Sequence, residues 1–280
     1  FTKLHGNGND FIVIDEYQKV VIPDEMKGQF AVCYCDRRFG IGADGVIFLM
    51  RSEKNDLRMR LLQPDESEAE MCGNGIRCLA KAAFDAGYIK NSCTVETPAG
   101  SVGVTMENTE DGFTATVTMT PPLFDRKDIP ATGSGEYKEH IGDYDVYAVN
   151  TGVPHAVLFV DDAESVPVEA LGRVIRFHER FAPQGTNVNF VSQGAGNMLH
   201  IRTYERGVEG ETFACGTGSV AAALIAAALG MTALPVSLQT RGGEQLRVDA
   251  ESARAPFGAV FLEGGTRKVC EGILCSEAWG

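Results

Sequence analysis

The chain has 280 residues, of which 44% are apolar, and a formal net charge of −13. This length suits one large domain or two ordinary ones, and the apolar fraction is that of a globular protein. The acidic balance disfavours a nucleic-acid partner, and no apolar run approaches the roughly 18 residues of a membrane helix. The first residues do not resemble a signal peptide, so we expect a cytoplasmic protein with neither nucleic-acid nor membrane partners.

The first part of the chain is predicted to form strands and then a helix. Three segments have the composition of strands, namely Phe11–Asp15, Val46–Met50 and Leu57–Leu62. The helix is predicted by apolar residues at helical spacing, namely Ile76, Leu79, Ala80, Ala83 and Phe84. On this pattern Arg77, Lys81 and Asp85 share a second, polar face, and Gly87 is a suitable C-cap.

The rest of the chain is predicted to form two hairpins and a second helix. Residues 101–106 and 113–119 alternate around a polar turn, which predicts a hairpin, and residues 121–135 resemble a link between two lobes. A second helix, from Ser219 onward, is apolar on all sides and is therefore expected to be buried. A second hairpin is expected to join Gln245–Ala250 to Ala259–Leu262.

The eight cysteines favour free thiols in a reducing compartment. Neither a C-x-x-C pair nor an H-x-x-x-H pair is present, and these are the spacings that commonly indicate zinc. Cys33 and Cys35 are a poor chelate, because on a strand their side chains would point in opposite directions. We therefore expect no metal site.

The two halves of the chain resemble one another at an offset of 143 residues (215 minus 72). The offset was chosen from the cysteines of "MCGNG" and "ACGTG", which place Cys72 on Cys215. Independent support comes from other positions that coincide at the same offset, namely Gly42 with Gly185, Glu66 with Glu209, Glu68 with Glu211, Gly87 with Gly230, Thr97 with Thr240 and Gly100 with Gly243. Chance similarity between two segments rich in glycine and alanine is the alternative explanation.

A repeat of this kind predicts an α+β fold of two pseudo-symmetric lobes. Each lobe is expected to be rich in strands that wrap around one buried or half-buried helix. We expect the N-terminal lobe to span residues 1–119, with residues 264–280 returning to it, and the C-terminal lobe to span residues 120–263.

Each predicted helix is preceded by a cysteine followed by Gly-x-Gly. A helix N-terminus presents unpaired N–H groups and about half a positive charge, which favours a thiolate or a bound carboxylate. The glycines let a ligand approach the backbone closely. A single copy of this motif is more often a buried cysteine in a turn, whereas two copies in symmetric lobes favour a functional site.

Paired thiols predict one class of chemistry. If both cysteines act on one ligand, a thiolate can remove a proton from a carbon while the other thiol delivers one to the opposite face, which inverts a stereocentre. A cysteine protease or transferase would instead pair one cysteine with a histidine.

Three polar clusters are candidate ligand contacts. "HGNGND" (residues 5–10) does not fit a dinucleotide fingerprint, because it precedes a strand rather than a helix. "NTGVPH" brings His155, which could tune a nearby thiol or be structural. In "YERGVEGE", Glu205 and Arg206 could bind an amino and a carboxylate group, or form a solvated turn.

Seven motifs in order across nearly the whole chain resemble the diaminopimelate epimerase family. They are "HGNGNDF", "GIGADGVIFL", "MCGNGIRC", "TGVPHAV", "GTNVNFV", "YERGVEGET" and "ACGTGSVAAA". The resemblance implies a barrel-like, mostly antiparallel sheet around a central helix in each lobe. It also implies epimerisation of LL- and meso-diaminopimelate in lysine biosynthesis, without pyridoxal phosphate or any other cofactor, and a homodimer.

The resemblance also implies the roles of individual residues. Cys72 and Cys215 correspond to the acid/base pair, supported by His155 and Glu205. The substrate would contact a larger set, namely Asn9, Gln63, Gly73, Asn74, Asn187, Glu205, Arg206, Gly216 and Thr217.

Three positions depart from the family pattern. Gln63 stands where many members have asparagine, Val153 where many have a substrate-binding asparagine, and Gly45 where some have glutamine. These departures put in doubt how the enzyme recognises the distal end of the substrate, which is the end farther from the reacting carbon. Two alternatives stay open: a related two-cysteine racemase or epimerase for another amino acid, and a non-catalytic amino-acid-binding module.

Overall fold

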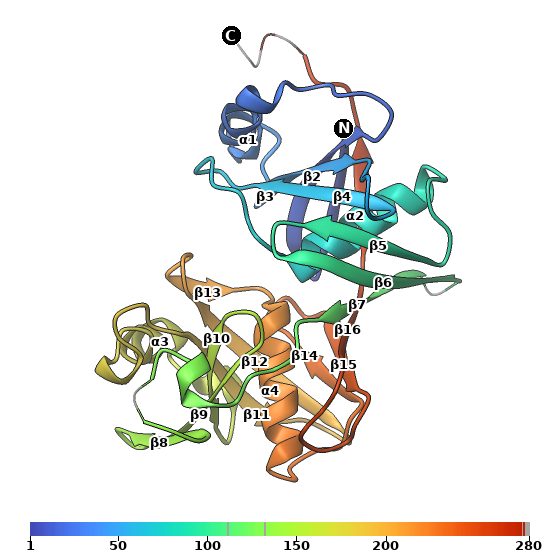
Figure 1. The fold of residues 1–280 in the computed structure, drawn as a ribbon. Coiled ribbons are helices and arrows are strands. Elements are labelled where there is room, and N and C mark those ends of the chain that lie inside the picture. Colours follow the sequence, from blue (N-terminus) through green and yellow to red (C-terminus); the bar gives the residue numbers. More distant parts are fainter. Residues whose placement is uncertain (111, 132, 276, 278–280) are drawn as a thin grey trace. The chain divides into compact units, whose positions relative to one another are not determined.

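The computed structural model describes residues 1–110, 112–131, 133–275 and 277 (Figure 1). The chain divides into two compact units, Phe1–Val117 with Gly264–Gly280, and Thr118–Glu263. Both units combine a mixed sheet with a few helices, so the fold is α+β, as predicted from the sequence. Each unit is described by itself below.

Strands account for most of the first unit. Its strands are β1 (Thr2–Gly6), β2 (Asn9–Glu16), β3 (Gly45–Met50), β4 (Leu57–Leu62), β5 (Ser92–Thr97), β6 (Gly100–Thr109), β7 (Gly112–Met119) and β17 (Arg267–Glu271). Its helices are the short η1 (Asp24–Met26), α1 (Lys27–Cys35) and α2 (Gly73–Asp85).

The strands of the first unit pair in the order β17–β1–β2–β3–β4–β5–β6–β7. The pairings β2–β3 and β4–β5 are parallel, and the others in this row are antiparallel. Helix α2 packs against β1, β2, β3, β4 and β6. Its apolar side chains Ile76, Leu79, Ala80 and Ala83 are completely buried, which is the face that their spacing predicts.

The second unit contains a similar set of elements. Its strands are β8 (Tyr137–Ile141), β9 (Tyr144–Asn150), β10 (Pro154–Phe159), β11 (Asn187–Gln193), β12 (Met198–Glu205), β13 (Gly210–Thr212), β14 (Val236–Gln239), β15 (Gln245–Ala250) and β16 (Val260–Gly265). Its helices are η2 (Arg126–Asp128), η3 (Ala163–Ser165), α3 (Val168–Arg176), η4 (Glu179–Phe181) and α4 (Gly216–Ala228).

The pairing of the second unit repeats that of the first. Its strands pair in the order β8–β9–β10–β11–β12–β14–β15, with β10–β11 and β12–β14 parallel and the others antiparallel. The short strand β13 also pairs with β12. The six pairings of the second row therefore follow the same order of antiparallel and parallel neighbours as the first six pairings of the first row.

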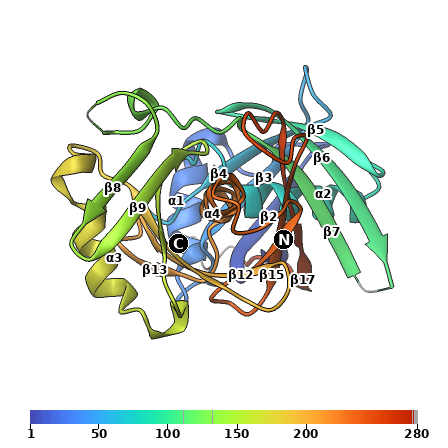
Figure 2. The same ribbon diagram turned by 90° about the horizontal axis from the view of Figure 1, so that it is seen from below.

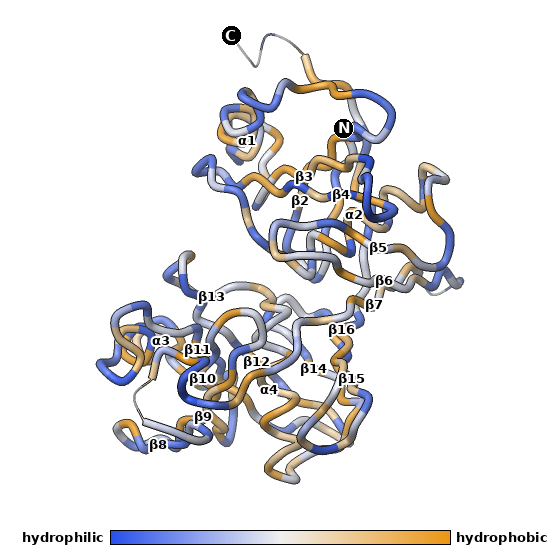
Figure 3. The backbone as a smooth tube through the Cα atoms, viewed as in Figure 1, coloured by the Kyte–Doolittle hydropathy of each residue, from blue (hydrophilic) through white to orange (hydrophobic). Residues whose placement is uncertain are grey.

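Helix α4 is the buried centre of the second unit. It packs against β9, β10, β11, β12, β14 and β15, and Figure 2 looks nearly along its axis. The run from Gly218 to Ala227 is buried on every side, and Figure 3 shows no strongly hydrophilic residue along it. In the described parts of the chain, no helix has the length and apolar character needed to cross a membrane.

Backbone conformation supports the internal repeat independently of residue identity. Helices α2 and α4 have 13 residues each, and their first residues lie 143 positions apart. Glu66 and Glu209 both have a positive φ, which is uncommon for glutamate. Three glycine pairs at the same offset also have a positive φ, namely Gly42 with Gly185, Gly87 with Gly230 and Gly100 with Gly243. Chance similarity of composition does not explain matching left-handed residues.

Four details differ from the sequence-based expectations. Cys33 and Cys35 lie on helix α1 and not on a strand, and α4 begins at Gly216 rather than Ser219. Residues 121–135, apart from Thr132, which lies outside the described residues, lie within the second unit, as the expected lobe bounds place them, and do not span the boundary between the units as a link would. Arg77 is fully buried instead of lying on a polar face, and its Nη2 donates to the side-chain oxygens of Asn7 and Asn74.

Candidate active site

Both predicted catalytic cysteines are the N-cap residues of the central helices. Cys72 precedes α2 with φ −146° and ψ 110°, and Cys215 precedes α4 with φ −120° and ψ 111°. These extended conformations turn each side chain toward the first turn of its helix, where the backbone N–H groups are unpaired. Both thiols therefore lie in the field of a helix N-terminus, which stabilises negative charge.

In the first unit, Cys72 lies among amide groups. Its Sγ accepts a hydrogen bond from the backbone N–H of Gly75 at 3.4 Å and lies 3.8 Å from Oδ1 of Asn9. The same Asn9 oxygen accepts a hydrogen bond from Nδ2 of Asn74 at 3.1 Å. The structure thus brings together the predicted residues Asn9, Cys72 and Asn74.

A network of charged side chains fixes the position of the Asn9 side chain. Its Nδ2 donates to Asp44 at 2.6 Å, and Arg37 pairs with both Asp44 and Asp10 at 2.7 Å. Lys3 pairs with Asp10 at 2.6 Å. Burial opposes ionisation of Asp10, but the hydrogen bonds from Arg37 and Lys3 hold the pKa of its carboxyl below its usual value.

In the second unit, Cys215 lies at the end of a chain of hydrogen bonds. Oγ1 of Thr217 is 3.5 Å from Sγ of Cys215 and 2.9 Å from Nε2 of His155. Nδ1 of His155 accepts from Nδ2 of Asn189 at 3.1 Å. The structure thus brings together the predicted residues Cys215, Thr217 and His155, with Thr217 between the other two.

His155 is completely buried on β10. Burial, reinforced by the positive charge of Arg206, lowers its pKa to about 3. The imidazole is therefore neutral throughout the physiological range and acts on its neighbours as a hydrogen-bonding group rather than as a cation.

Gly218 permits this arrangement by its lack of a side chain. A Cβ at this position would collide with Oδ1 of Asn189 and would lie 3.3 Å from Sγ of Cys215. The equivalent glycine of α2, Gly75, has its nearest Cβ neighbours at 3.5 Å. The two helix starts therefore differ in how closely the surrounding side chains approach them.

The turn between β12 and β13, called the β12 turn here, carries the candidate residues Glu205 and Arg206. Hydrogen bonds to Asn187 and Thr212 hold it. Asn187 binds the carbonyl of Pro154 at 3.0 Å and the backbone N–H of Arg206 at 2.8 Å. Glu205 accepts from the hydroxyl of Thr212 at 2.9 Å. Within the described residues, the guanidinium of Arg206 has no hydrogen-bond or ion-pair partner, and burial and the nearby Arg176 lower its pKa.

The three departures from the family pattern lie at or next to strand ends: Gly45 begins β3, Gln63 follows β4 and Val153 precedes β10. Gln63 is exposed directly after β4, and Val153 is half-buried directly before β10. At Gly45, a Cβ would lie 2.7 Å from Cδ1 of Leu61 and 3.0 Å from the carbonyl oxygen of Leu62. A side chain at position 45 would therefore require Leu61 to move and would crowd the backbone of β4.

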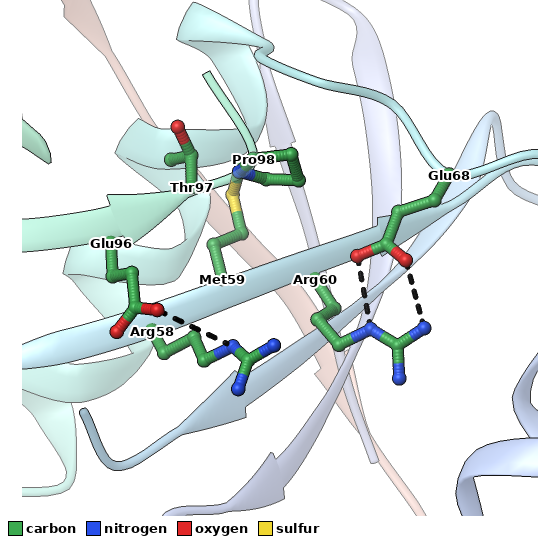
Figure 4. A pocket seen from close by; sticks show the side chains of 7 residues that line it. All are labelled: Arg58, Met59, Arg60, Glu68, Glu96, Thr97 and Pro98. Atoms are coloured by element: carbon green, nitrogen blue, oxygen red, sulfur yellow. Dashed lines mark hydrogen bonds and ion pairs between the residues drawn. The ribbon is translucent and has the colours of Figure 1, made fainter. Parts of the chain in front are cut away.

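A salt bridge fixes the segment that leads to Cys72. Glu68 accepts hydrogen bonds from Nε and Nη2 of Arg60 at 2.9 and 2.8 Å, beside a surface pocket of about 320 Å³ (Figure 4). Glu68 also forms an isolated bridge to Leu62. A bidentate pair of this kind fixes position as well as charge, so it helps to set the course of the chain toward the cysteine.

The other thiols have surroundings that do not suit catalysis. Cys35, Cys78 and Cys93 are buried, and burial raises the pKa of Cys35 and of Cys93 to about 12 and also raises that of Cys78. Cys270 and Cys275 are exposed, and all eight cysteines are free. Only Cys72 and Cys215 cap the central helices.

Two residues of the site were missed in the sequence, Asp44 and Asn189. Asp44 fixes Asn9, and Asn189 fixes His155. Asn189 carries a partial signal, because it is an amide between the apolar residues Val188 and Phe190 of a buried strand. Asp44 follows a glycine-rich turn and carries no such signal.

Several known proteins resemble this chain over nearly its whole length. The family model described as diaminopimelate epimerase matches residues 1–124 and 147–262. The diaminopimelate epimerase of Methanothrix thermoacetophila is 50% identical over 278 residues, which cover 99% of this chain and 96% of that protein. The enzyme of the same name from Methanocella arvoryzae is 50% identical over 277 residues, with 98% and 96% covered.

A solved structure shows the same fold. The Bacillus anthracis phenazine biosynthesis protein of the PhzF family superimposes with a TM-score of 0.72, with 98% of both chains covered and 17% identity. At this identity the likeness establishes the fold alone. The family model and the two relatives, in contrast, match over most of the sequence, and the chain therefore belongs to the diaminopimelate epimerase family.

Proposed function

We propose that this chain is an isomerase that interconverts LL- and meso-diaminopimelate in lysine biosynthesis. The observation that carries the proposal is the pair of cysteine N-caps on two helices related by the repeat, in a chain that belongs to this family. Inversion of a carbon centre needs a base on one face and an acid on the other. Two like residues on two like lobes are suited to supply that pair.

In the proposed reaction, one cysteine thiolate removes the α-proton, so that a C–H bond breaks and an S–H bond forms. The thiol of the other cysteine delivers its proton to the opposite face of the same carbon, so that an S–H bond breaks and a C–H bond forms. One proton leaves the substrate and one arrives, and thiol and thiolate exchange places. The reverse reaction uses Cys72 and Cys215 in exchanged roles.

The main barrier is the low acidity of the α-proton compared with that of a thiol. Backbone N–H groups at Gly73–Asn74 and Gly216–Thr217 lie at helix N-termini and are suited to hold the substrate carboxylate. Donors fixed in advance stabilise the charge that develops in the transition state, and more strongly when water is excluded. Because acid and base are both side chains, we propose that neither pyridoxal phosphate nor a metal takes part.

His155 and Glu205 are proposed to support the proton transfer. The hydrogen bond from His155 to Thr217, which itself contacts Cys215, gives the imidazole an indirect influence on that thiol. Glu205 is held by Thr212 and precedes Arg206 in the same turn. A carboxylate there can serve either the proton transfer or the distal ammonium group of the substrate.

The distal end of the substrate is proposed to bind at the β12 turn. Arg206 is a half-buried cation without a partner among the described residues, which suits bidentate binding of a carboxylate. Asn187 holds the backbone of Arg206, while Asn9 and Gln63 are the proposed contacts from the first unit.

The test is incubation of the purified protein with LL-diaminopimelate without added cofactor, followed by chiral analysis of the product. We expect conversion to the equilibrium mixture with the meso isomer. Proline, hydroxyproline and glutamate are tested as substrates of the related racemases. Turnover of one of these in place of diaminopimelate would contradict the proposed substrate. Binding of diaminopimelate without conversion would indicate a binding module.

We further propose that the protein is a homodimer of the cytoplasm. The dimer rests on the family resemblance, and the cytoplasm on eight free cysteines, which suit a reducing compartment. Light scattering during size-exclusion chromatography should give twice the mass of one chain. A mass equal to that of one chain would contradict the dimer.

A further inference from the structure

Arg176 is a buried cation at the end of helix α3 whose side chain reaches the β12 turn. Only 9% of this side chain is exposed. Its Nε and Nη2 donate to Oε1 of Glu209 at 3.2 and 2.9 Å, and its Nη1 donates to the carbonyl oxygen of Gln184 at 2.9 Å. One arginine therefore joins three segments, namely helix α3, the loop before β11 and the β12 turn.

The backbone around Arg176 is shaped to admit this side chain. Gly185 has a φ of 67°, and a Cβ at this position would overlap both the guanidinium and the carbonyl oxygen of Arg176. Four residues before Arg176, Gly172 lies so close to β12 that a Cβ there would be 2.6 Å from Cβ of Tyr204. Helix α3 is therefore packed directly on the strand that leads into the β12 turn.

Glu209 closes the β12 turn. It has a φ of 55°, and its backbone N–H donates to the carbonyl oxygen of Glu205 at 2.9 Å. Its Oε1 accepts from the backbone N–H of Gly207 at 3.1 Å as well as from Arg176, so one carboxylate oxygen receives three donors. Burial opposes ionisation of Glu209, but the hydrogen bonds from Gly207 and Arg176 hold the pKa of its carboxyl below its usual value.

Arg206 lies in the same turn as Glu209 but does not pair with it. Oppositely charged groups this close in sequence ordinarily attract one another. However, Oε1 of Glu209 is occupied by Arg176 and Gly207, and Oε2 is shielded from solvent without a hydrogen-bond partner among the described residues. Burial and the charge of Arg176 lower the pKa of Arg206, although the charge of Glu209 acts in the opposite direction. Arg176 therefore holds the carboxylate that would otherwise be available to Arg206.

The equivalent turn of the first unit has neither cation. At the offset of 143 residues, Arg206 corresponds to Gln63 and Arg176 corresponds to Cys33. Glu66, the counterpart of the glutamate that closes the β12 turn, has a positive φ and donates its backbone N–H to the carbonyl oxygen of Gln63 at 3.1 Å. In the described part of the first unit, Glu66 forms no ion pair. The buried arginine therefore occurs where the turn carries a cation that the glutamate could neutralise.

We propose that Arg176 is a positioning residue that keeps the carboxylate of Glu209 away from Arg206, so that Arg206 stays open for the distal carboxylate of the substrate. The proposal deepens the proposed function and rests on it. Arg176 itself does not touch the substrate. Without it, Oε1 of Glu209 loses two of its three donors and pairs with Arg206, and the substrate must then compete with a carboxylate of the protein.

The experiment is steady-state kinetics of LL-diaminopimelate epimerisation with wild type and Arg176→Gln. The variant should raise KM roughly tenfold, the effect of one hydrogen bond between charged groups. We expect kcat to change much less, because the reacting carbon is at the other end of the substrate. Unfolded molecules lower the apparent kcat but leave KM unchanged, so KM separates recognition from loss of the fold.

A second substitution tests whether Arg176 acts through Glu209. In the double variant Arg176→Gln/Glu209→Gln, the amide at position 209 has no charge with which to bind Arg206. Its KM should therefore return most of the way to the wild-type value. Arg176→Lys keeps a cation for Glu209 without the planar fork, and should raise KM less than Arg176→Gln does.

The matched control is Arg173→Gln on the same helix. Arg173 is exposed, and among the described residues it donates no hydrogen bond to the β12 turn. Its charge nevertheless acts on Glu209, so this variant removes one positive charge near the turn without removing a donor. KM should stay at the wild-type value.

A wild-type KM in Arg176→Gln would overturn the proposal. A KM in the double variant as high as that of Arg176→Gln alone would also overturn it, because Arg176 would then not act through Glu209. Either result with a wild type that epimerises diaminopimelate concerns this inference alone. A wild type that does not epimerise diaminopimelate would overturn the proposed function.

Discussion

The carboxylate of Glu211 accepts two parallel hydrogen bonds from the guanidinium of Arg202, at 2.6 and 2.7 Å. Arg202 also donates to three backbone carbonyls, those of Ala163, Glu164 and Val166. Glu211 lies four residues before Cys215, as Glu68, the partner of Arg60, lies four residues before Cys72. In each unit, an arginine on the preceding strand therefore fixes the segment that leads to the proposed catalytic cysteine.

Replacement of Arg202 by lysine should destabilise the protein. Lysine cannot form the fork with Glu211 and also reach the three carbonyls, so largely buried polar groups lose their partners. We expect the free energy of unfolding to fall by about 2–4 kcal/mol, measured by urea denaturation. The matched control is Arg247→Lys, because Arg247 makes a single contact of 3.3 Å with Glu263 and is half-exposed. Equal losses in both variants would contradict a special role for Arg202.

Gly218 and Gly75 occupy equivalent positions in the two helices but should respond differently to alanine. Gly218→Ala brings a Cβ into Asn189 and toward Cys215, so the free energy of unfolding should fall by about 1–3 kcal/mol. Gly75→Ala meets only ordinary contacts and should be neutral or stabilise by up to about 1 kcal/mol, since alanine favours helix. Thermal and urea unfolding of both variants measure the effect, and the opposite order would be inconsistent with the described packing.

The buried His155 should make the protein sensitive to acid. The pKa of its imidazole is lowered to about 3 in the fold, from 6.5. Between these values the unfolded chain binds a proton that the folded chain does not, so stability is full above pH 6.5 and is lost as pH falls toward 3. The loss from this group is at most about 1.4 kcal/mol per pH unit.

The comparison variant is His155→Gln, which does not titrate and keeps an N–H group for Thr217. Between about pH 7.5 and about pH 4.5, wild type should lose roughly 2–3 kcal/mol more than the variant. Urea unfolding at both pH values gives this difference. The same loss in both proteins would show that His155 is not the group responsible.

Much of the fold could be predicted from the sequence because it is encoded locally. The apolar spacing of α2 predicted its buried face, and the uniformly apolar α4 predicted a central helix. The offset of 143 residues predicted a repeat, which Glu66 and Glu209 support through their shared backbone conformation. Helix α1 was missed because its apolar residues follow no clear helical period, and the inter-lobe link was placed too late.

Site residues could be predicted where they belong to a local sequence motif. They could not be predicted where their role depends on partners far away in the sequence. The cysteines and their glycines are recognisable from their own neighbours in sequence. Arg77 was assigned to a polar face by its spacing, yet it is buried because Asn7, 70 positions away, accepts from its guanidinium. Asn189 and Asp44 act through side chains 34 and 35 residues away, and local sequence does not show which partners they contact.

We propose that Cys72 and Cys215 form one acid/base pair for one carbon. Its most direct test is ¹H NMR of LL-diaminopimelate in D₂O with wild type, Cys72→Ala and Cys215→Ala. Wild type should convert the substrate to the meso isomer and place deuterium at one α-carbon, and Cys72→Ala and Cys215→Ala should each abolish epimerisation. Full turnover by either single variant would contradict the two-thiol account.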